Sequence, residues 1–266
     1  MCEQLFIPAC KAAIFVQFMI KKFAHDDVVP NSSSTLSKKE QVANMFDNIA
    51  YRYDFLNRFL SAGTDIIWRK KALNFLKDAK PQRILDVATG TADVAIMAAK
   101  QLKASEIIGI DISDGMLEIG RKKIASNNLE QVITLYNGDS EAIKYSDNSF
   151  DAVTVAFGVR NFQNLAKGLS EILRVLQPGG KLVVLEFSRP RKAFFKYFYD
   201  VYMKTIAPGM GKLFSKNRGA YQYLDESIKK FPEGKNFTQI LETVGYRNIV
   251  YKSLSFGICT IYCGQK

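Results

Sequence analysis

Residues 83–93 read Arg83-Ile-Leu-Asp-Val-Ala-Thr-Gly-Thr-Ala-Asp93 and predict a buried strand, a tight turn and the start of a helix. The apolar run through Val87 has the length of a strand that is covered on both faces. Gly90 supplies the backbone freedom that such a turn needs. Because ligands of parallel sheets bind at the carboxyl ends of the strands, this unit predicts a binding site around the loop.

Strands and helices alternate on both sides of this unit. Strands are predicted at residues 83–88, 107–111, 132–136, 150–156 and 181–187, and helices at residues 93–102, 115–126, 165–176 and 236–244. Two final strands, 246–254 and 257–264, are joined by a short turn and should be antiparallel. The pattern predicts an α/β fold with a doubly wound, seven-stranded, mostly parallel sheet whose last strand is antiparallel.

The chain upstream of the sheet differs in character. Residues 1–38 are expected to form a flexible extension, since residues 26–38 are polar and serine-rich and the apolar run 7–20 is too short to span a membrane. Residues 39–80 show helical spacing of apolar side chains and are interpreted as a helical lid. Residues 81–187 then form the cofactor-binding core, and residues 188–266 a substrate-side insertion followed by the last strands.

The amino-acid composition restricts the partners, metal sites and catalytic groups that this chain can have. The 266 residues carry a net charge of +11, which favours anionic partners. The four cysteines lack the paired spacing of a zinc site, and a reducing cytoplasm is the expected compartment. The only histidine, His25, lies in the predicted extension, so we expect neither a histidine base, nor a Ser-His triad, nor a bound metal.

Carboxylates at three successive strand ends predict the ligand. The first loop has one glycine between Asp86 and Asp93, which suits a cation rather than a pyrophosphate. S-adenosylmethionine, with its ammonium and sulfonium groups, fits. Asp111 is placed to accept from both ribose hydroxyls and Asp139 from the adenine amino group, although each acid alone has a capping, turn or solvated-loop alternative. The predicted cofactor-binding residues are Asp86, Gly90, Thr91, Asp111, Asp139 and Ser140.

From about residue 40 onward the chain resembles the demethylmenaquinone and demethylubiquinol C-methyltransferases. The resemblance rests on Phe46-Asp-Asn-Ile-Ala-Tyr-Arg-Tyr-Asp54, Leu85 to Asp93, Phe157-Gly-Val-Arg-Asn161, Leu185-Glu-Phe-Ser188 and Tyr223-Leu-Asp-Glu-Ser-Ile228. Two departures are Ala92, where a third loop glycine is usual, and Ile143-Lys-Tyr145 in place of Leu-Pro-Phe. The resemblance implies a Rossmann-like class I methyltransferase fold and methyl transfer to a ring carbon of a polyprenylated hydroquinone, with the menaquinone branch preferred over ubiquinone.

Methyl transfer to such a ring needs help with a phenolic proton. We expect Arg160 to stabilise the developing phenolate and Asn161 to orient a water or the ring oxygen, with Tyr53 hydrogen-bonding from the lid. The alternatives are a surface or salt-bridging Arg160 and a packed core Tyr53. Since the expected site has no histidine, this help must come from other residue types.

A polyprenyl substrate implies contact with an anionic membrane surface from the cytoplasmic side. Residues 189–204 mix cations with aromatic side chains and could enter the interface or pack on the domain. No nucleic-acid module is visible, and a homodimer is left open. Rival interpretations are a nucleic-acid methyltransferase, a non-catalytic cofactor-binding subunit and an NAD-dependent oxidoreductase.

Overall fold

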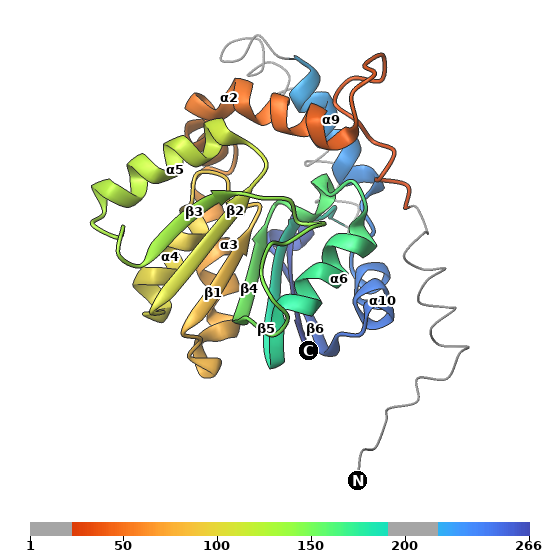
Figure 1. The fold of residues 1–266 in the computed structure, drawn as a ribbon. Coiled ribbons are helices and arrows are strands. Elements are labelled where there is room, and N and C mark those ends of the chain that lie inside the picture. The colour runs from red at the N-terminus through yellow and green to blue at the C-terminus, as the bar shows by residue number, and fades with distance from the viewer. Residues whose placement is uncertain (1–22, 191–217) are drawn as a thin grey trace.

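The computed structural model describes residues 23–190 and 218–266, and its centre is one seven-stranded sheet (Figure 1). The strand order is β3-β2-β1-β4-β5-β7-β6, and only β7 runs antiparallel to its neighbours. The predicted doubly wound sheet with an antiparallel last strand is therefore confirmed. The strands are β1 (Arg83–Val87), β2 (Glu106–Asp111), β3 (Ile133–Asn137), β4 (Phe150–Ala156), β5 (Leu176–Phe187), β6 (Arg247–Leu254) and β7 (Cys259–Gln265).

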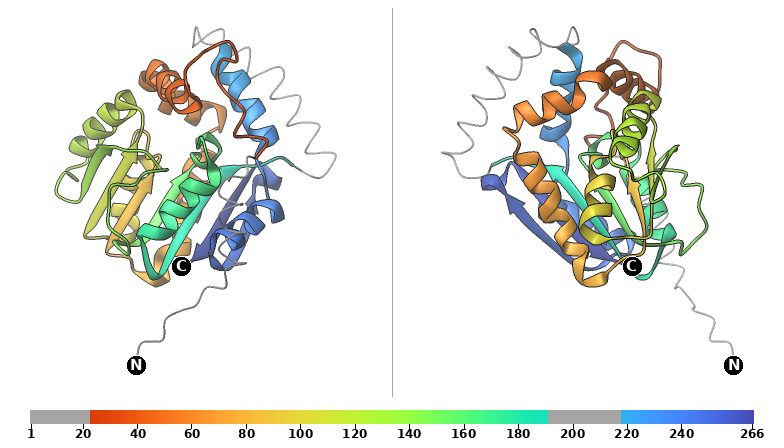
Figure 2. Two further views of the ribbon diagram at one scale, coloured as in Figure 1. Left: turned by 45° about the vertical axis from the view of Figure 1, so that its right-hand side comes forward. Right: turned by 90° about the vertical axis from the view of Figure 1, so that its left-hand side faces the viewer.

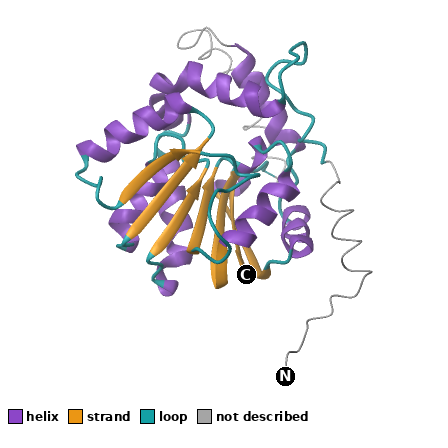
Figure 3. Ribbon diagram, viewed as in Figure 1, coloured by secondary structure: helices purple, strands orange, loops and turns teal. Residues whose placement is uncertain are grey.

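Helices cover both faces of the sheet, as Figures 2 and 3 show. On one face α3 (Thr64–Leu73), the short helix η1 (Asn74–Ala79), α4 (Asp93–Leu102) and α5 (Asp114–Ser126) share a core with the strands. On the other face α6 (Leu165–Val175) and α10 (Lys235–Val244) form a second core. Both faces of the central strands are thus buried, which explains their continuous apolar runs.

Two further helices cross the carboxyl edge of the sheet. Figure 1 shows α2 (Lys38–Leu60) and α9 (Arg218–Lys230) above the strand ends. A capping box starts α2, because Ser37 and Glu40 satisfy each other's backbone N–H groups. Asp47 of α2 accepts the Ser113 hydroxyl at 2.6 Å and so ties α2 to the start of α5. Helix α9 was not predicted from the sequence.

Residues 23–37, called here the N-terminal strap, differ from the expected flexible extension. His25 is fully buried, and Val28 packs with Val42 and Met45 of α2 and Tyr223 of α9. The strap is held because it offers apolar side chains to the gap between these helices. None of the described helices carries an apolar run long enough to cross a membrane.

The predicted lid is also smaller than expected. Trp68, Leu73 and Leu76 are buried in the core on one face of the sheet, so α3 and η1 belong to a covering layer. Of the predicted lid, only α2 lies over the strand ends. The cause is packing, since α3 presents its apolar side chains to β5 and α4. Of the cationic and aromatic segment 189–204, all but the first two residues lie outside the described residues.

Candidate active site

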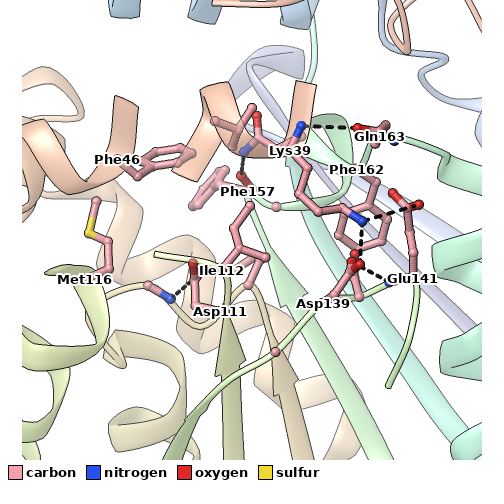
Figure 4. A pocket seen from close by; sticks show the side chains of 18 of the residues that line it. Lys39, Phe46, Asp111, Ile112, Met116, Asp139, Glu141, Phe157, Phe162 and Gln163 are labelled. Carbon is pink, nitrogen blue, oxygen red and sulfur yellow. Dashed lines mark hydrogen bonds and ion pairs between the residues drawn. The ribbon is translucent and has the colours of Figure 1, made fainter. Parts of the chain in front are cut away.

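A polar pocket opens at the carboxyl ends of β1 to β4, beneath α2 (Figure 4). The loop after β1 contributes Ala88 and Gly90, whose φ angles are 54° and 55°. The predicted need for unusual backbone angles at Gly90 is therefore confirmed. The pocket is lined by residues from the lid and from four strand ends, among them Lys39, Phe46, Tyr53, Ala88, Gly90, Asp111, Met116, Asp139, Ser140, Phe157 and Asn161.

Asp111 ends β2 and lines the polar pocket. Its two carboxylate oxygens accept the backbone N–H groups of Gly90 at 2.8 Å and Ser113 at 2.9 Å. Burial raises the pKa of this carboxyl, and the N–H donors act against that rise. Since a carboxylate offers about four lone-pair sites, Asp111 keeps the capacity to accept two ribose hydroxyls.

The loop after β3 places Asp139, Ser140 and Glu141 in the wall of the polar pocket. Asp139 accepts the Glu141 N–H at 2.9 Å and forms an ion pair with Lys39 of α2. Figure 4 shows the Lys39 side chain reaching from α2 to Asp139, with its Nζ 3.8 Å from Glu141. The lid is therefore attached to the loop where the adenine was predicted.

Asp86 of β1 and Thr91 of the loop that follows are absent from the described wall of the polar pocket. Asp86 is buried and accepts the hydroxyls of Thr89 at 2.6 Å and Thr154 at 2.5 Å. Burial raises its pKa to about 6. Thr91 donates to Asp54 at 2.6 Å. In this structure the two residues shape the loop through its hydrogen bonds.

The surroundings of Asp93 contradict the prediction that the first loop offers two carboxylates to a cationic ligand. Its carboxylate pairs with Arg58 of α2 at 2.6 Å and with Lys123 of α5. These cations already meet its charge, and they lower its pKa despite burial. The loop therefore does not present two free carboxylates to a ligand, and the negative side chains of the pocket come from the later strand ends.

An apolar cavity of about 160 Å³ adjoins the polar pocket. It lies between α2, α3, α9 and the ends of β4 and β5, and its wall includes Met45, Leu56, Leu60, Trp68, Phe187, Leu224, Ile228 and Ile258. Its few polar side chains include Asp65, Arg69 and Arg160. Phe46, Tyr53 and Phe157 line both spaces. A flat ring in the apolar cavity would therefore lie next to a ligand in the polar pocket.

Arg160 follows β4 in the short helix η2 (Val159–Asn161) and lines the apolar cavity. Its Nη1 donates to Glu186 at 2.7 Å and to the Phe157 carbonyl at 2.6 Å. Burial acts to lower the pKa of Arg160, but the charge of Glu186, its hydrogen bond and the nearby hydroxyls of Tyr53 and Tyr223 together outweigh burial, and the pKa is raised. The salt-bridging alternative for Arg160 is thus present, and it holds the guanidinium at the cavity wall.

Asn161 and Tyr53 occupy the junction of the two spaces. Asn161 lines the polar pocket, and its amide oxygen accepts the Tyr223 hydroxyl at 3.0 Å. Tyr53 is half-buried, and its ring packs edge-on against Phe46 at 5.8 Å. Burial raises the pKa of Tyr53, so its hydroxyl stays protonated at neutral pH and can donate.

Several residues of the site had no assigned role in the sequence. Lys39, Arg69 and Tyr223 reach it from three different helices, and ordinary helical patterns give no sign of such convergence. Glu186 could have been found, because it lies in the Leu185-Glu-Phe-Ser188 motif and a charged residue inside an apolar strand calls for a buried partner.

Comparison with known sequences agrees with this geometry. The model of the ubiE/COQ5 methyltransferase family matches residues 34–266. A demethylmenaquinone methyltransferase of Bacteroides fragilis is 48% identical over 86% of this chain and 94% of its own length. A ubiquinone/menaquinone biosynthesis C-methyltransferase UbiE of Geobacter sulfurreducens is 46% identical over 86% and 90%.

Solved structures share the fold. A SAM-dependent methyltransferase of Thermotoga maritima, described as a possible histamine N-methyltransferase, superposes with a TM-score of 0.59 at 18% identity, over 84% of this chain and 99% of its own. A phosphoethanolamine N-methyltransferase of Haemonchus contortus in complex with S-adenosylmethionine gives 0.55 at 16% identity, over 74% and 52%. The match over residues 34–266 shows that the chain belongs to the ubiE/COQ5 methyltransferase family, and its fold is one that S-adenosylmethionine-dependent methyltransferases share.

Proposed function

We propose that this protein transfers a methyl group from S-adenosylmethionine to a ring carbon of a polyprenylated demethylmenaquinol, forming menaquinol. The observation that carries the proposal is the shared wall of Phe46, Tyr53 and Phe157 between a polar pocket and an apolar cavity. The names of the relatives at 42–48% identity support the same acceptor class. The equivalent step on a benzoquinol is the alternative outcome of the test below.

The residues of the polar pocket fit S-adenosylmethionine. Asp111 has acceptor capacity for the ribose hydroxyls, and Asp139 with Ser140 lies one strand further along, where the adenine would extend. Gly90, without a side chain, lets the ligand approach the backbone of the first loop. When bound, the cofactor supplies an electrophilic methyl group.

In our proposal the apolar cavity holds the acceptor ring. A hydroquinone ring carbon becomes a good nucleophile when the neighbouring hydroxyl loses its proton to water. Once the carbon has taken the methyl group, with S-adenosylhomocysteine as the leaving product, it gives up its own hydrogen to water as a proton and the ring becomes aromatic again. In our proposal Arg160 stabilises the phenolate of the first step in surroundings of low polarity, where its charge has a large effect. Glu186 keeps the Arg160 guanidinium in place at 2.7 Å. Asn161 then orients the ring oxygen or a water, and Tyr53 donates a hydrogen bond from the lid.

A prenylated substrate also suggests where the protein works. The net charge of +11 favours peripheral contact with an anionic membrane surface on the cytoplasmic side. Such contact would bring the apolar cavity close to the lipid that dissolves the prenyl tail. A homodimer is compatible with this arrangement and is tested by the mass of the protein in solution.

The decisive experiment incubates the purified protein and labelled S-adenosylmethionine with reduced demethylmenaquinol and demethylubiquinol analogues side by side. We expect faster labelling of the naphthoquinol. Preference for the benzoquinol would reassign the acceptor, and labelling of neither ring would overturn the proposal.

The role of Arg160 is tested with Arg160→Ala. Loss of one charge-stabilising donor should lower kcat by about 100-fold or more. S-adenosylmethionine binding, measured by calorimetry, should be retained because Arg160 does not line the polar pocket among the described residues. Arg121→Ala, on α5 and absent from both described walls, is the matched control. Full turnover by Arg160→Ala would exclude the assigned role.

A further inference from the structure

Tyr223 of α9 connects the wall of the apolar cavity with the wall of the polar pocket. It lines the apolar cavity, and its hydroxyl donates a hydrogen bond of 3.0 Å to the amide oxygen of Asn161, which lines the polar pocket. Tyr223 is 3% exposed, whereas Asn161 is half-buried. Asn161 is therefore the member of this pair that a ligand at the junction of the two spaces can reach.

The Asn161 amide has a second contact, made by its nitrogen. Nδ2 donates to the Phe157 carbonyl at 3.4 Å, and the same carbonyl accepts Nη1 of Arg160 at 2.6 Å. A side-chain amide has two N–H donors. The second N–H of Asn161 meets no acceptor among the residues that the structure describes. One donor of a side chain in the pocket wall is thus left for a ligand.

The two partners of the Asn161 amide together favour one orientation. The Phe157 carbonyl can only accept, so it selects the amide nitrogen. Burial raises the pKa of Tyr223, so its hydroxyl keeps its proton at neutral pH and donates to the amide oxygen. Without this hydroxyl, the long 3.4 Å contact with Phe157 alone would fix the amide. Tyr223 therefore supplies the stronger of the two restraints.

A free N–H suits an oxygen atom that gains negative charge. In the proposed reaction the hydroxyl next to the accepting carbon loses its proton, and the Asn161 N–H would add a second donor beside Arg160. An amide that presented its oxygen would repel the same phenolate. We propose that Tyr223 is a positioning residue, which holds the Asn161 amide with its N–H toward the ring oxygen of the acceptor. This inference rests on the proposed function.

The Tyr223 ring is held independently of its hydroxyl. It packs with Val28 of the N-terminal strap and with Val42 and Met45 of α2 in one buried cluster. These apolar contacts remain in Tyr223→Phe, so the variant should keep the ring in place and remove only the hydrogen bond to Asn161. The effect of the hydroxyl can therefore be separated from the packing of α9.

The test is a double-mutant cycle of kcat, measured with labelled S-adenosylmethionine and the demethylmenaquinol analogue. Tyr223→Phe should lower kcat by about 3- to 10-fold, the effect of one ordinary hydrogen bond. Asn161→Ala should lower kcat by about 10-fold or more. When Asn161 is already alanine, Tyr223→Phe should change kcat by less than about 2-fold, because the group that it positions is gone. A purely structural role of Tyr223 would not produce this dependence on Asn161.

Tyr246 offers a matched control. It is buried, its hydroxyl donates to the Leu169 carbonyl at 3.0 Å, and it lies outside the described walls of both cavities. Tyr246→Phe thus removes a buried hydrogen bond of the same length at a distance from the reaction. Both variants should lower the free energy of unfolding, but only Tyr223→Phe should lower kcat.

Asn161→Asp distinguishes a donor from an acceptor at the junction. It keeps an oxygen for the Tyr223 hydroxyl but has no N–H, so kcat should fall at least as far as in Asn161→Ala. Wild-type kcat in Tyr223→Phe, or an equal loss with and without the Asn161 amide, would make Tyr223 a structural residue and overturn the inference. Failure of the wild-type protein to label the acceptor would overturn the proposed function itself, so the two failures are distinguishable.

Discussion

His25, the only histidine, packs into the N-terminal strap instead of the two cavities. Its ring lies 6.1 Å from Phe23 and 5.4 Å from Phe231, and the Nζ of Lys38 donates to its carbonyl at 2.8 Å. Burial, assisted by the charge of Lys38, lowers the pKa of His25 to about 3. At neutral pH the imidazole is therefore uncharged and serves packing.

This depressed pKa predicts acid sensitivity. Between its ordinary pKa of 6.5 and about 3, His25 binds a proton in the unfolded chain but not in the folded one. Stability is therefore fully present above pH 6.5 and lost as the pH falls. By pH 5 the loss should reach about 2 kcal/mol relative to pH 7.5.

The measurement is urea unfolding of wild-type protein and His25→Phe at several pH values. The variant keeps an aromatic ring between Phe23 and Phe231 and cannot titrate. Asp26 and Lys38, the charged neighbours, remain in both proteins, so the difference isolates His25. Parallel stability curves for the two proteins between pH 7.5 and pH 5 would contradict the burial of this side chain.

At the scale of elements, the site depends on the contact between the loops after β1 and β4. Gly158, at the start of the Arg160 turn, has a φ of −110°, which any residue adopts. A Cβ added there would lie 2.6 Å from the Cβ of Ala88 in the first loop. Gly158 is therefore required for close approach, and that approach brings Asn161 to the polar pocket.

Gly158→Ala should push these two loops apart. We expect kcat to fall by about 10-fold or more, since small displacements of reacting groups are costly, and stability to fall by about 1–3 kcal/mol. The double variant Gly158→Ala with Ala88→Gly removes the clashing methyl group and should recover much of the turnover. Its glycine also suits the φ of 54° at position 88.

A stability control separates this effect from general destabilisation. Gly179 has a φ of 82° inside β5, where the pairing with β4 is irregular between Leu176 and Lys181, and it lies outside the described walls of both cavities. Gly179→Ala should cost about 1 kcal/mol through backbone strain without lowering kcat. Kinetics are compared below the melting temperature of each protein. Wild-type turnover in Gly158→Ala would show that the two loops accommodate a methyl group at position 158 without moving apart.

At the scale of the whole molecule, α2 is held over the strand ends by polar contacts, and the chain carries a net charge of +11. Helix α2 is joined to the sheet by Lys39–Asp139, Arg58–Asp93 and Asp47–Ser113, which all cross from the lid to loops or helices at the strand ends. The two ion pairs are partly exposed and each costs little to break, whereas the Ser113 hydroxyl is buried. Ligand entry past α2 is compatible with such attachment.

The net charge of +11 predicts electrostatic binding to anionic vesicles. Sedimentation with anionic vesicles should weaken strongly as the salt concentration rises from about 0.05 M to about 0.5 M, because surface attraction is screened. Vesicles of neutral lipid at low salt form the control and should bind much less protein. Binding that ignored both salt and lipid charge would exclude the electrostatic mechanism.

Local patterns were sufficient for the sheet and for part of the polar pocket. Apolar runs and turn residues predicted all seven strands, and the carboxylates that end β2 and follow β3 do line the pocket. The reason is topological, because parallel strands bring their carboxyl ends to one edge whatever the side chains elsewhere. Arg160 and Asn161 were found through a motif at the same edge.

The features that local sequence patterns did not predict depend on contacts between segments that are far apart in the chain. Asp93 was predicted to face the ligand, but in the fold Arg58 of α2 and Lys123 of α5 form ion pairs with it. The strap looked flexible because its burial requires α2 and α9, and α9 itself was not predicted. Arg69 joined the apolar cavity because α3 packs beside Phe157, a position that sequence spacing does not encode. The strands themselves follow from local periodicity, whereas their order in the sheet, the pairing of charges and the shape of the cavity arise only from tertiary packing.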